Sequence, residues 1–522
     1  MKTYALCGLM IVFLLNCSSP KPSTNETEIN QKEPISSAKK ELKEVRGVWI
    51  TNVDSDVLFS ADSIAIAMKV LAEQGFNVVF PVVWNKDMTL HPSEVMVKTF
   101  GEDYRQDPVV KNAGIDPLKI MTFEAHRNGL EIIPWFEFGF SSSYNDNGGH
   151  VVQLKPHWAA KDSAGNLLKK NNFEWLNGIH PEVQDFMTDL IMEVVQNYDI
   201  DGIQGDDRLP AMPSHGDFSE YTINQYKIET GKSVSMSKEP EFMAWKAGKL
   251  NDFAKRLYTK VKAFNSNLIV SFSPSVYPWS YENYLQDSPS WVKGEYVDLL
   301  IPQVYRYEID RYKTTLDDVL TYHPGILNSK TTLSGGILIK AGTRYNDYSY
   351  VKEAIAYNRE KNVSGEVFFF YEGLDEKNGN LGDSLAANEY KTKASLPYRA
   401  EDYRSFQLEE IKSGKESKNE IVFNLTKMGV YDLYIKMNHT LKPLQFSTSG
   451  SKKDGIEVQF IPKEEQTMHL GWQITNRIQC KSSGSLSLKV AESYDKETEL
   501  KGSSIEVVLL YNQLESLKKN KN

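Results

Sequence analysis

Acidic side chains follow several short apolar runs in the central part of the chain. Glu137 lies near the end of LEIIPWFEF (130–138), and the adjacent acids Asp206 and Asp207 close the run DGIQGDD (201–207). Hydrolysis of a glycosidic bond needs one protonated carboxyl that donates to the leaving oxygen and a second group that attacks the sugar or activates water. Paired acids also raise each other's pKa, which yields a proton donor near neutral pH. We therefore predict that Asp206, Asp207 and Glu137 carry acid/base catalysis.

The sequence leaves a structural role open for each of these acids. Neighbouring residues on a strand point to opposite sides, so one of Asp206 and Asp207 could pair with Arg208 while the other reaches a substrate. Glu137 could likewise belong to a structural ion pair. Asp201 begins its run, and we expect it to cap or pair structurally at the opposite end of the strand.

Further polar residues near the ends of such runs are candidates for substrate contact. They are Asp54, His180, Gln303, Tyr305 and Glu372. Trp135 stands two residues before Glu137 and adds an aromatic face of the kind that stacks on sugars.

The spacing of histidine, glycine and serine argues against several other chemistries. The histidines form no H-x-H or H-E-x-x-H pair, so we expect no metal ion, and a metal-dependent deacetylase is disfavoured. No G-x-G-x-x-G turn, Walker-type loop or G-x-S-x-G elbow occurs, so we expect neither a nucleotide cofactor nor a serine esterase.

The elements that must position these residues alternate along the first two thirds of the chain. Short β-branched and aromatic runs alternate with amphipathic helical stretches, a pattern typical of βα units and a parallel sheet. The predicted strands cover 47–53, 77–84, 130–138, 201–206, 268–274, 297–305, 332–339 and 365–372. The predicted helices include 63–75, 181–198, 242–265 and 348–362.

Eight such strands predict an α/β fold with a closed (β/α)8 TIM barrel over residues 44–395, with an open doubly wound sheet as the alternative. Barrel active sites lie where the strands end, at the C-terminal face. Two connections at that face are long, 85–115 and 137–180, and we expect them to wall the cleft.

The helical periodicity disappears after about residue 396. Segments such as GVYDLYIKM (429–437) and SSIEVVLLY (503–511) alternate with Gly, Ser and Asn turns, which predicts an all-β sandwich accessory domain over 396–515. Its role stays open between a carbohydrate-binding module, an interface domain and a stabilising cap. We expect the tail LKKNKN (517–522) to be frayed.

The N-terminus has the features of an export signal. Lys2 supplies a positive start, an apolar stretch covers about 4–15, and Cys17 follows, so we predict a lipoprotein signal peptide over 1–17 with a lipid on Cys17. The polar, Pro/Ser-rich segment 18–43 is predicted to be a disordered tether. These features predict an anchored protein of the bacterial cell envelope, in the outer membrane. Cys480 is then left without a partner and is expected to be a small buried hydrophobe.

The charge of the chain restricts its partners. A formal net charge of -9, with no long run of Lys or Arg, argues against a nucleic-acid partner. We expect a polysaccharide substrate, membrane contact only through the N-terminal lipid, and a monomer.

Several segments together resemble the glycosyl-hydrolase-like family 10 of bacterial barrel proteins. They are EVRGVWITNVDSDVLFS (44–60), FNVVFPVVWN (76–85), LEIIPWFEFGF (130–140), WLNGIHPEVQ (175–184), DGIQGDD (201–207), IPQVYRYEID (301–310) and VFFFYEGL (367–374). The resemblance implies a (β/α)8 hydrolase fold and a glycan substrate, and it adds Trp84, Asn85 and Asn177 to the substrate-binding candidates. Gly205 and Arg208 depart from the family pattern, which has an aromatic residue before the acidic pair and a histidine or aromatic residue after it.

The predicted function is that of an envelope-anchored glycoside hydrolase that cleaves a polysaccharide. The glycan strands of peptidoglycan are one candidate substrate. The alternative is a catalytically inactive, glycan-binding scaffold lipoprotein. The run 201–207 is also similar to the D-x-x-D-x-E run of chitinase-like enzymes, with Arg208 in place of the final Glu, so a substrate-assisted mechanism stays open as well.

Overall fold

The computed structural model describes most of the chain from residue 42 onward, and these residues belong to one compact unit. The described ranges are 42–234, 238–400, 406–412, 420–425, 427–437, 446–448, 456–462, 468–481, 484–490 and 504–521. The predicted signal peptide, Cys17 and most of the tether lie outside these ranges.

All eight predicted strands of the first part exist, although they are shorter than predicted. They are β1 (Val45–Ile50), β2 (Val78–Pro81), β5 (Glu131–Ile132) with β6 (Trp135–Phe136), β10 (Gly202–Gly205), β11 (Ile269–Phe272), β12 (Leu299–Leu300), β13 (Thr332–Leu333) with β14 (Gly335–Leu338), and β17 (Gly365–Phe369). They pair in parallel in two five-stranded sheets, ordered β14-β17-β1-β2-β5 and β13-β12-β11-β10-β6. The third and seventh predicted strands are thus each divided between the two sheets.

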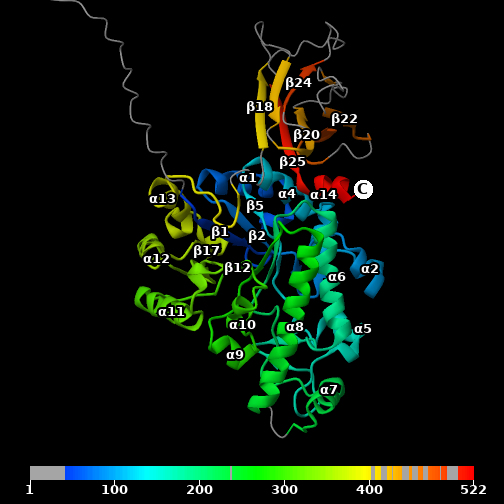
Figure 1. Cartoon of the computed structure of the whole chain (residues 1–522), viewed down its shortest axis with the longest axis vertical. Helices are drawn as coiled ribbons and strands as arrows, with labels where there is room; N and C mark the ends of the chain where they lie inside the picture. Colours follow the sequence, from blue (N-terminus) through cyan, green and yellow to red (C-terminus); the bar gives the residue numbers. More distant parts are fainter. Residues whose placement is uncertain are drawn as a thin grey trace, which may run out of the picture. The chain divides into compact units, whose positions relative to one another are not determined.

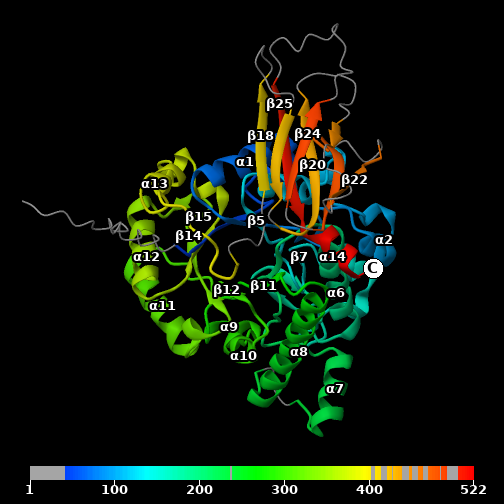
Figure 2. The same ribbon diagram turned by 45° about the horizontal axis from the view of Figure 1, so that its top comes forward.

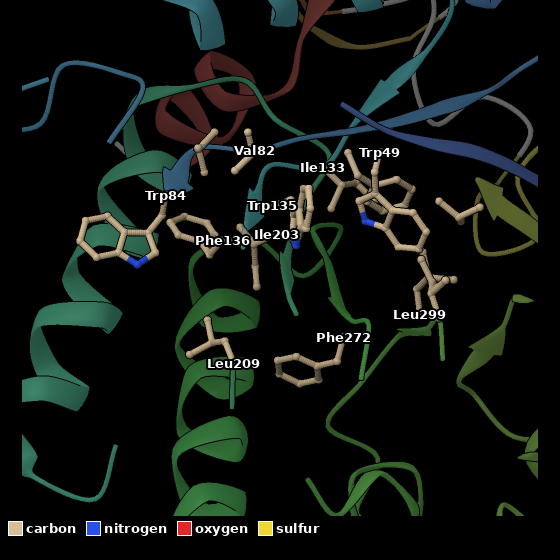
Figure 3. Packing of buried hydrophobic residues seen from close by; sticks show 14 of the residues in the cluster. Trp49, Val82, Trp84, Ile133, Trp135, Phe136, Ile203, Leu209, Phe272 and Leu299 are labelled. Atoms are coloured by element: carbon tan, nitrogen blue, oxygen red, sulfur yellow. The ribbon is translucent and has the colours of Figure 1, made fainter. Parts of the chain in front are cut away.

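Two isolated parallel bridges join the sheets at these divided strands. Val82, directly after β2, bridges to Trp135, and Gln303, three residues after β12, bridges to Gly336. Inside the sheets, Trp49 on β1 donates from Nε1 to Gln204 Oε1 on β10 at 2.6 Å. The Trp49 and Trp135 rings lie 6.3 Å apart within the buried cluster shown in Figure 3. The two sheets therefore share one interior.

Helices lie around the outside of these strands (Figure 1, Figure 2). The longer ones are α1 (Ala61–Glu73), α4 (Pro117–Arg127), α6 (Pro181–Asn197), α7 (Glu220–Thr230), α8 (Pro240–Phe264), α11 (Ile309–Tyr322) and α12 (Tyr348–Glu360). The predicted helices are confirmed as α1, α6, α8 and α12. In α1, Ser60 caps the first turn by accepting from the Ser63 amide, and the apolar face with Ile64, Met68 and Leu71 is fully buried.

The two long connections carry secondary structure of their own. The first holds β3 (Trp84–Asn85), β4 (Met88–Thr89), α2 (Glu94–Phe100) and α3 (Pro108–Ala113). The second holds β7 (Ser141–Tyr144), α5 (Gly149–Leu154), β8 (Lys169–Lys170) and β9 (Phe173–Trp175). Glu193 of α6 fixes the first connection because its carboxylate accepts from the amides of Glu94 and Val95 at 2.7 and 3.1 Å, at the N-terminus of α2.

The opposite ends of the strands are held by a separate polar cluster. Asp201, as predicted, has a structural role there: its Oδ2 lies 2.9 Å from His126 Nε2 and accepts from the Ile132 amide at 2.8 Å. Arg399 donates to Glu131 Oε1 at 2.6 Å, to the carbonyl of Asp201 at 2.8 Å, and to the carbonyl of Asn267. The segment just before residue 400 is therefore bound to this end of the strands.

The last part of the described chain contains antiparallel strands. One sheet has the order β18 (Phe406–Lys412), β25 (Ser504–Asn512), β20 (Gly429–Met437), β23 (Trp472–Cys480) and β22 (Ile456–Phe460). The other has the order β19 (Glu420–Leu425), β24 (Gly484–Val490) and β21 (Phe446–Thr448). Cys480, at the end of β23, is buried, as predicted.

The expectation of a frayed tail is wrong for residues 517–521. They belong to α14 (Gln513–Lys521). Asn512 Oδ1 accepts from the Glu515 amide at 2.9 Å, and Asp199 accepts from the Leu514 amide at 3.0 Å. Two orphan amides of the first turn are thereby satisfied, and the Gln, Leu, Glu and Lys residues of the segment favour a helix.

The remaining short helices complete the loops between these elements. They are α9 (Trp279–Tyr284), α10 (Ser288–Lys293) and α13 (Leu381–Ala387).

Candidate active site

Arg208 stands between all three predicted catalytic acids. Its Nη2 lies 3.1 Å from Asp206 Oδ2 and 3.2 Å from Glu137 Oε1, and its Nη1 lies 3.0 Å from Asp207 Oδ1. We call these four residues the acidic cluster. The sequence left open whether one acid pairs with Arg208, and the structure shows that all three do.

The strand ends bring the acidic cluster together. Glu137 directly follows β6, and Asp206 and Asp207 directly follow β10, which pairs with β6 in parallel. Carboxyl ends of parallel neighbours lie at one edge, so these side chains meet although 69 residues separate Glu137 from Asp206 in sequence. A Cβ on Gly205 would collide with the carbonyl of Leu209 and lie 2.8 Å from the Phe272 ring. Glycine is therefore required where the resemblance leads one to expect an aromatic residue.

Two amide side chains orient the buried acids. Gln303 donates from Nε2 to Asp206 Oδ1 at 2.7 Å and to the Ser273 carbonyl at 3.1 Å. Asn85 donates from Nδ2 to Glu137 Oε2. Both Asp206 and Glu137 therefore have each carboxyl oxygen in contact with a donor, whereas the Asp207 side chain is the most exposed of the three, at 25%. Asp207 is the acid most open to an incoming ligand.

The electrostatics of the acidic cluster favour retention of a proton. Burial raises the pKa of Asp206 well above its usual value, and the neighbouring Asp207 and Glu137 raise it further against the opposing effect of Arg208. Burial likewise raises the pKa of Glu137, while Arg208 and the Asn85 hydrogen bond lower it. One guanidinium cannot neutralise three carboxylates, so the proton affinities of Asp206 and Glu137 are coupled.

Tyr305 and Trp135 lie beside the acidic cluster. Burial, followed by the charges of Asp206 and Asp207, raises the pKa of Tyr305 well above its usual value, so its hydroxyl stays protonated. The Trp135 ring is buried against Trp49, and its Nε1 has no hydrogen-bond partner among the described residues. The Trp135 ring is only 2% exposed and presents no open face to a sugar, and the substrate contacts of Trp135 and Tyr305 stay predictions.

Other predicted substrate-binding residues are engaged elsewhere. The Trp84 ring is fully buried and donates to the Gly139 carbonyl at 3.1 Å, so it presents no face to a ligand. Asn177 is fully buried and donates to Ser219 Oγ at 3.0 Å and Thr222 Oγ1 at 2.9 Å, while its Oδ1 accepts from the Ile179 amide. In this structure both residues brace the loops around the strand ends.

The remaining predicted residues lie on separate loops. His180 caps α6 by accepting from the Glu182 amide at 3.3 Å, and its ring lies 4.7 Å from that of Tyr221. Asp54 is exposed on the loop after β1 and has a positive φ of 57°. Glu372 is half-buried in a short 3-10 turn after β17. In the part of the chain that the structure describes, no hydrogen bond or ion pair joins these three to the acidic cluster, and their substrate contacts stay predictions.

The sequence reasoning missed Tyr284. The charge of Asp207 contributes, after burial, to a raised pKa of Tyr284 of about 12, so its hydroxyl is close to the cluster. Tyr284 lies in α9, after β11, and the strand predicted at 268–274 could have drawn attention to the aromatic run that follows it.

Metal and membrane features are absent from the described residues. Within them, no group of three or more His, Cys, Asp or Glu side chains is placed to hold a metal ion. No helix in the same ranges is both long and apolar enough to cross a membrane.

Known proteins share this sequence pattern and fold. A sequence model of the family described as glycosyl hydrolase-like 10 matches residues 44–339, more than half of the chain. A relative in Escherichia coli (strain K12), named glycosyl hydrolase DigH, is 22% identical over 343 residues, which cover 58% of this chain and 74% of the relative. Glycosyl hydrolase YngK of Bacillus subtilis (strain 168) is 23% identical over 396 residues, which cover 68% of this chain and 73% of the relative.

A solved structure is similar to the same part of the chain. The PgaB (BpsB) glycoside hydrolase domain from Bordetella bronchiseptica matches with a TM-score of 0.50 at 12% identity, covering 66% of this chain and 99% of that domain. At this identity the likeness shows a shared (β/α)-type fold and nothing about residue roles.

Proposed function

Because the chain belongs to the glycosyl hydrolase-like 10 family, we propose that it hydrolyses glycosidic bonds of a polysaccharide by carboxylate acid/base catalysis. The acidic cluster is the observation that carries this proposal. It gathers three carboxyls at neighbouring strand ends, and burial raises the pKa of two of them. A glycosidase needs both a protonated and an ionised carboxyl in one site, which is what such a coupled set provides.

The different environments of the acids support a division of roles. Burial raises the pKa of Asp206 and Glu137, so one of them holds the proton that is donated to the leaving oxygen. Asp207, more exposed and paired with Arg208 Nη1, is the group that faces the sugar. Arg208, Asn85 and Gln303 position these carboxyls.

We also propose that the first part of the chain, residues 44–395, is a closed (β/α)8 barrel and that 396–515 is a β-sandwich accessory domain. The two bridges that join the parallel sheets at Trp135 and Gly336 support closure, because they connect the sheets at both divided strands. The two antiparallel sheets after residue 405 support the second assignment.

The cellular setting is part of the proposal and is supported by sequence alone. A lipid on Cys17 would hold a monomer in the bacterial envelope, at the outer membrane, with residues 18–43 as the tether. The glycan strands of peptidoglycan are then the nearest polymer, and we propose them as the first substrate to test.

A glycan-binding protein without catalysis is the second candidate function. The contact of every acid with Arg208 favours it, because a carboxyl held by a guanidinium is less available to a leaving oxygen. In the hydrolase, sugar binding must shift Arg208 or use the free oxygen of Asp207.

Product analysis by mass spectrometry separates the two functions. Residues 44–522 are incubated with intact and with peptide-free cell-wall glycan, alongside the double variant Asp206→Asn, Asp207→Asn. Fragments that form only with the unmodified protein establish hydrolysis, and their reducing ends identify the bond. Binding of glycan without fragments, on this and on a wider panel of polysaccharides, would reject the hydrolase in favour of the binding protein.

A further inference from the structure

Three basic side chains gather beside the acidic cluster. Lys170 lies in β8 of the second long connection, His215 in the loop after β10, and Lys238 just before α8. Burial and, to a smaller extent, the charge of Lys238 together lower the pKa of Lys170 to about 8. Lys170 and Lys238 also lower the pKa of His215 after burial does so. The three side chains therefore lie within electrostatic reach of one another.

The two lysines have neutral partners. Lys170 Nζ donates to the carbonyl of Asn283 at 2.7 Å and to its Oδ1 at 3.2 Å, and Lys238 Nζ donates to the carbonyl of Glu282 at 3.4 Å. Among the described residues, neither lysine forms an ion pair with a carboxylate. Lys170 is half-buried and Lys238 exposed, and two like charges near each other repel, so an anion that joined them would be stabilised.

Aromatic rings connect these cations to the acidic cluster. Lys170 Nζ lies 4.2 Å from the centre of the Tyr284 ring, and the Tyr284 hydroxyl accepts from Asn171 at 2.9 Å. The same Tyr284 is influenced by the charges of Asp207 and Arg208. The Trp279 ring, 46% exposed, lies 5.6 Å from that of Tyr284. A sugar that stacks on Trp279 would thus lie beside Tyr284, whose ring contacts Lys170 and whose hydroxyl is influenced by Asp207.

We propose that Lys170 and Lys238 form a cationic subsite that binds the carboxylate of an acidic sugar next to the bond that is cleaved. This inference rests on the proposed function, since it assumes that the acidic cluster receives a glycan. Charge-assisted hydrogen bonds from two ammonium groups suit a carboxylate, and the exposed indole suits the apolar face of the sugar ring. The subsite makes the substrate a glycan with acidic residues instead of a neutral polymer.

Matched pairs of sugars test the subsite by binding alone. N-acetylmuramic acid is compared with N-acetylglucosamine, and glucuronic acid with glucose, by calorimetric titration of the full chain carrying Asp206→Asn and Asp207→Asn. We expect at least one acidic member to bind about tenfold more tightly than its neutral partner, and this preference to vanish when Lys170→Gln and Lys238→Gln are added. Preference within the first pair identifies a lactyl carboxylate, and within the second a ring carboxylate.

The variant Lys69→Gln, on the exposed face of α1, is the matched control for loss of one positive charge. Equal affinities within both pairs, no binding of either acid, or a preference that survives the two lysine substitutions would each overturn the subsite. The same measurements separate failure of the proposed function from failure of the subsite. A preference for acidic sugars without cleavage of any polysaccharide would reject hydrolysis and keep the subsite. Cleavage without a preference for acidic sugars would reject the subsite and keep hydrolysis.

Discussion

Replacement of Arg208 by Gln should destabilise the protein in a pH-dependent manner. The substitution removes the guanidinium that contacts Asp206, Asp207 and Glu137 at 3.0 to 3.2 Å. The acids then lose an opposing charge that now lowers the pKa of Asp206 and Glu137. Their pKa values in the folded state should rise further above those of the unfolded chain.

The size of the effect follows from the burial of the pairs. At an effective dielectric constant of about 20, unit charges about 4 Å apart interact by about 4 kcal/mol. Removing one partner of a buried ion pair costs about 3 to 5 kcal/mol. We therefore expect the free energy of unfolding to fall by about 3 to 5 kcal/mol at pH 7. The loss is not three times larger, because the acids left without Arg208 can take up protons.

The sign of the pH dependence is fixed by linkage. With folded-state pKa values raised, the folded variant keeps protons that the unfolded chain releases, so its stability falls as pH rises above about 4. Towards pH 4 the acids of the unfolded chain take up protons as well, so the deficit should shrink towards about 1 to 2 kcal/mol, the loss expected from the missing hydrogen bonds.

Urea unfolding, followed by tryptophan fluorescence between pH 4 and pH 8, measures this difference. Arg256→Gln is the matched control because Arg256 is half-exposed and pairs with Asp185 at 3.4 Å on the surface, so it should cost less than about 1 kcal/mol. A deficit for Arg208→Gln that is constant over this range, or below about 1 kcal/mol at pH 7, would refute the account of the acidic cluster given above.

Three further predictions concern single side chains. Asp206→Asn should lower turnover by about 10² to 10⁴ and raise stability near pH 7 by about 0.5 to 2 kcal/mol, measured by product release and by melting temperature, because a carboxyl with a raised pKa favours folding only at low pH. Asn85→Ala should raise the pKa of Glu137 and, because a proton donor must keep its proton, move the alkaline limb of the pH–rate profile to higher pH; an unmoved limb would remove Asn85 from the site. Burial lowers the pKa of His91 to about 3, so stability should fall by about 1.4 kcal/mol per pH unit below about 6.5; His91→Met should flatten this slope in unfolding titrations, and an unchanged slope would contradict it.

The acidic cluster was predictable because strand ends follow a general rule. Buried apolar runs fixed where β6, β10 and β12 lie, and parallel pairing then brings the residues after them to one edge. Glu137, Asp206 and Gln303 came together for this reason. No knowledge of the packing between helices was needed.

The contacts that depend on distant side chains were not predictable. Asn177 looked like a ligand-binding amide, but its partners Ser219 and Thr222 lie more than 40 residues later, at the start of α7, whose position relative to Asn177 the sequence does not determine. Trp84 was misjudged for the same reason, since its burial depends on how the second long connection folds over it. The sequence also underestimated α14, because Asp199, which accepts from its first turn, is remote in the chain.

The contacts of Arg399 matter for expression of the first part of the chain, residues 44–395, without the antiparallel sheets. The change of sequence pattern near residue 396 invites truncation there, yet the guanidinium that joins Glu131, Asp201 and Asn267 is supplied three residues later. A chain that stops at 395 would keep every parallel strand. It would lose Arg399, the residue that joins the N-terminal ends of three of these strands. The shortest fragment suited to crystallisation should therefore extend to residue 400.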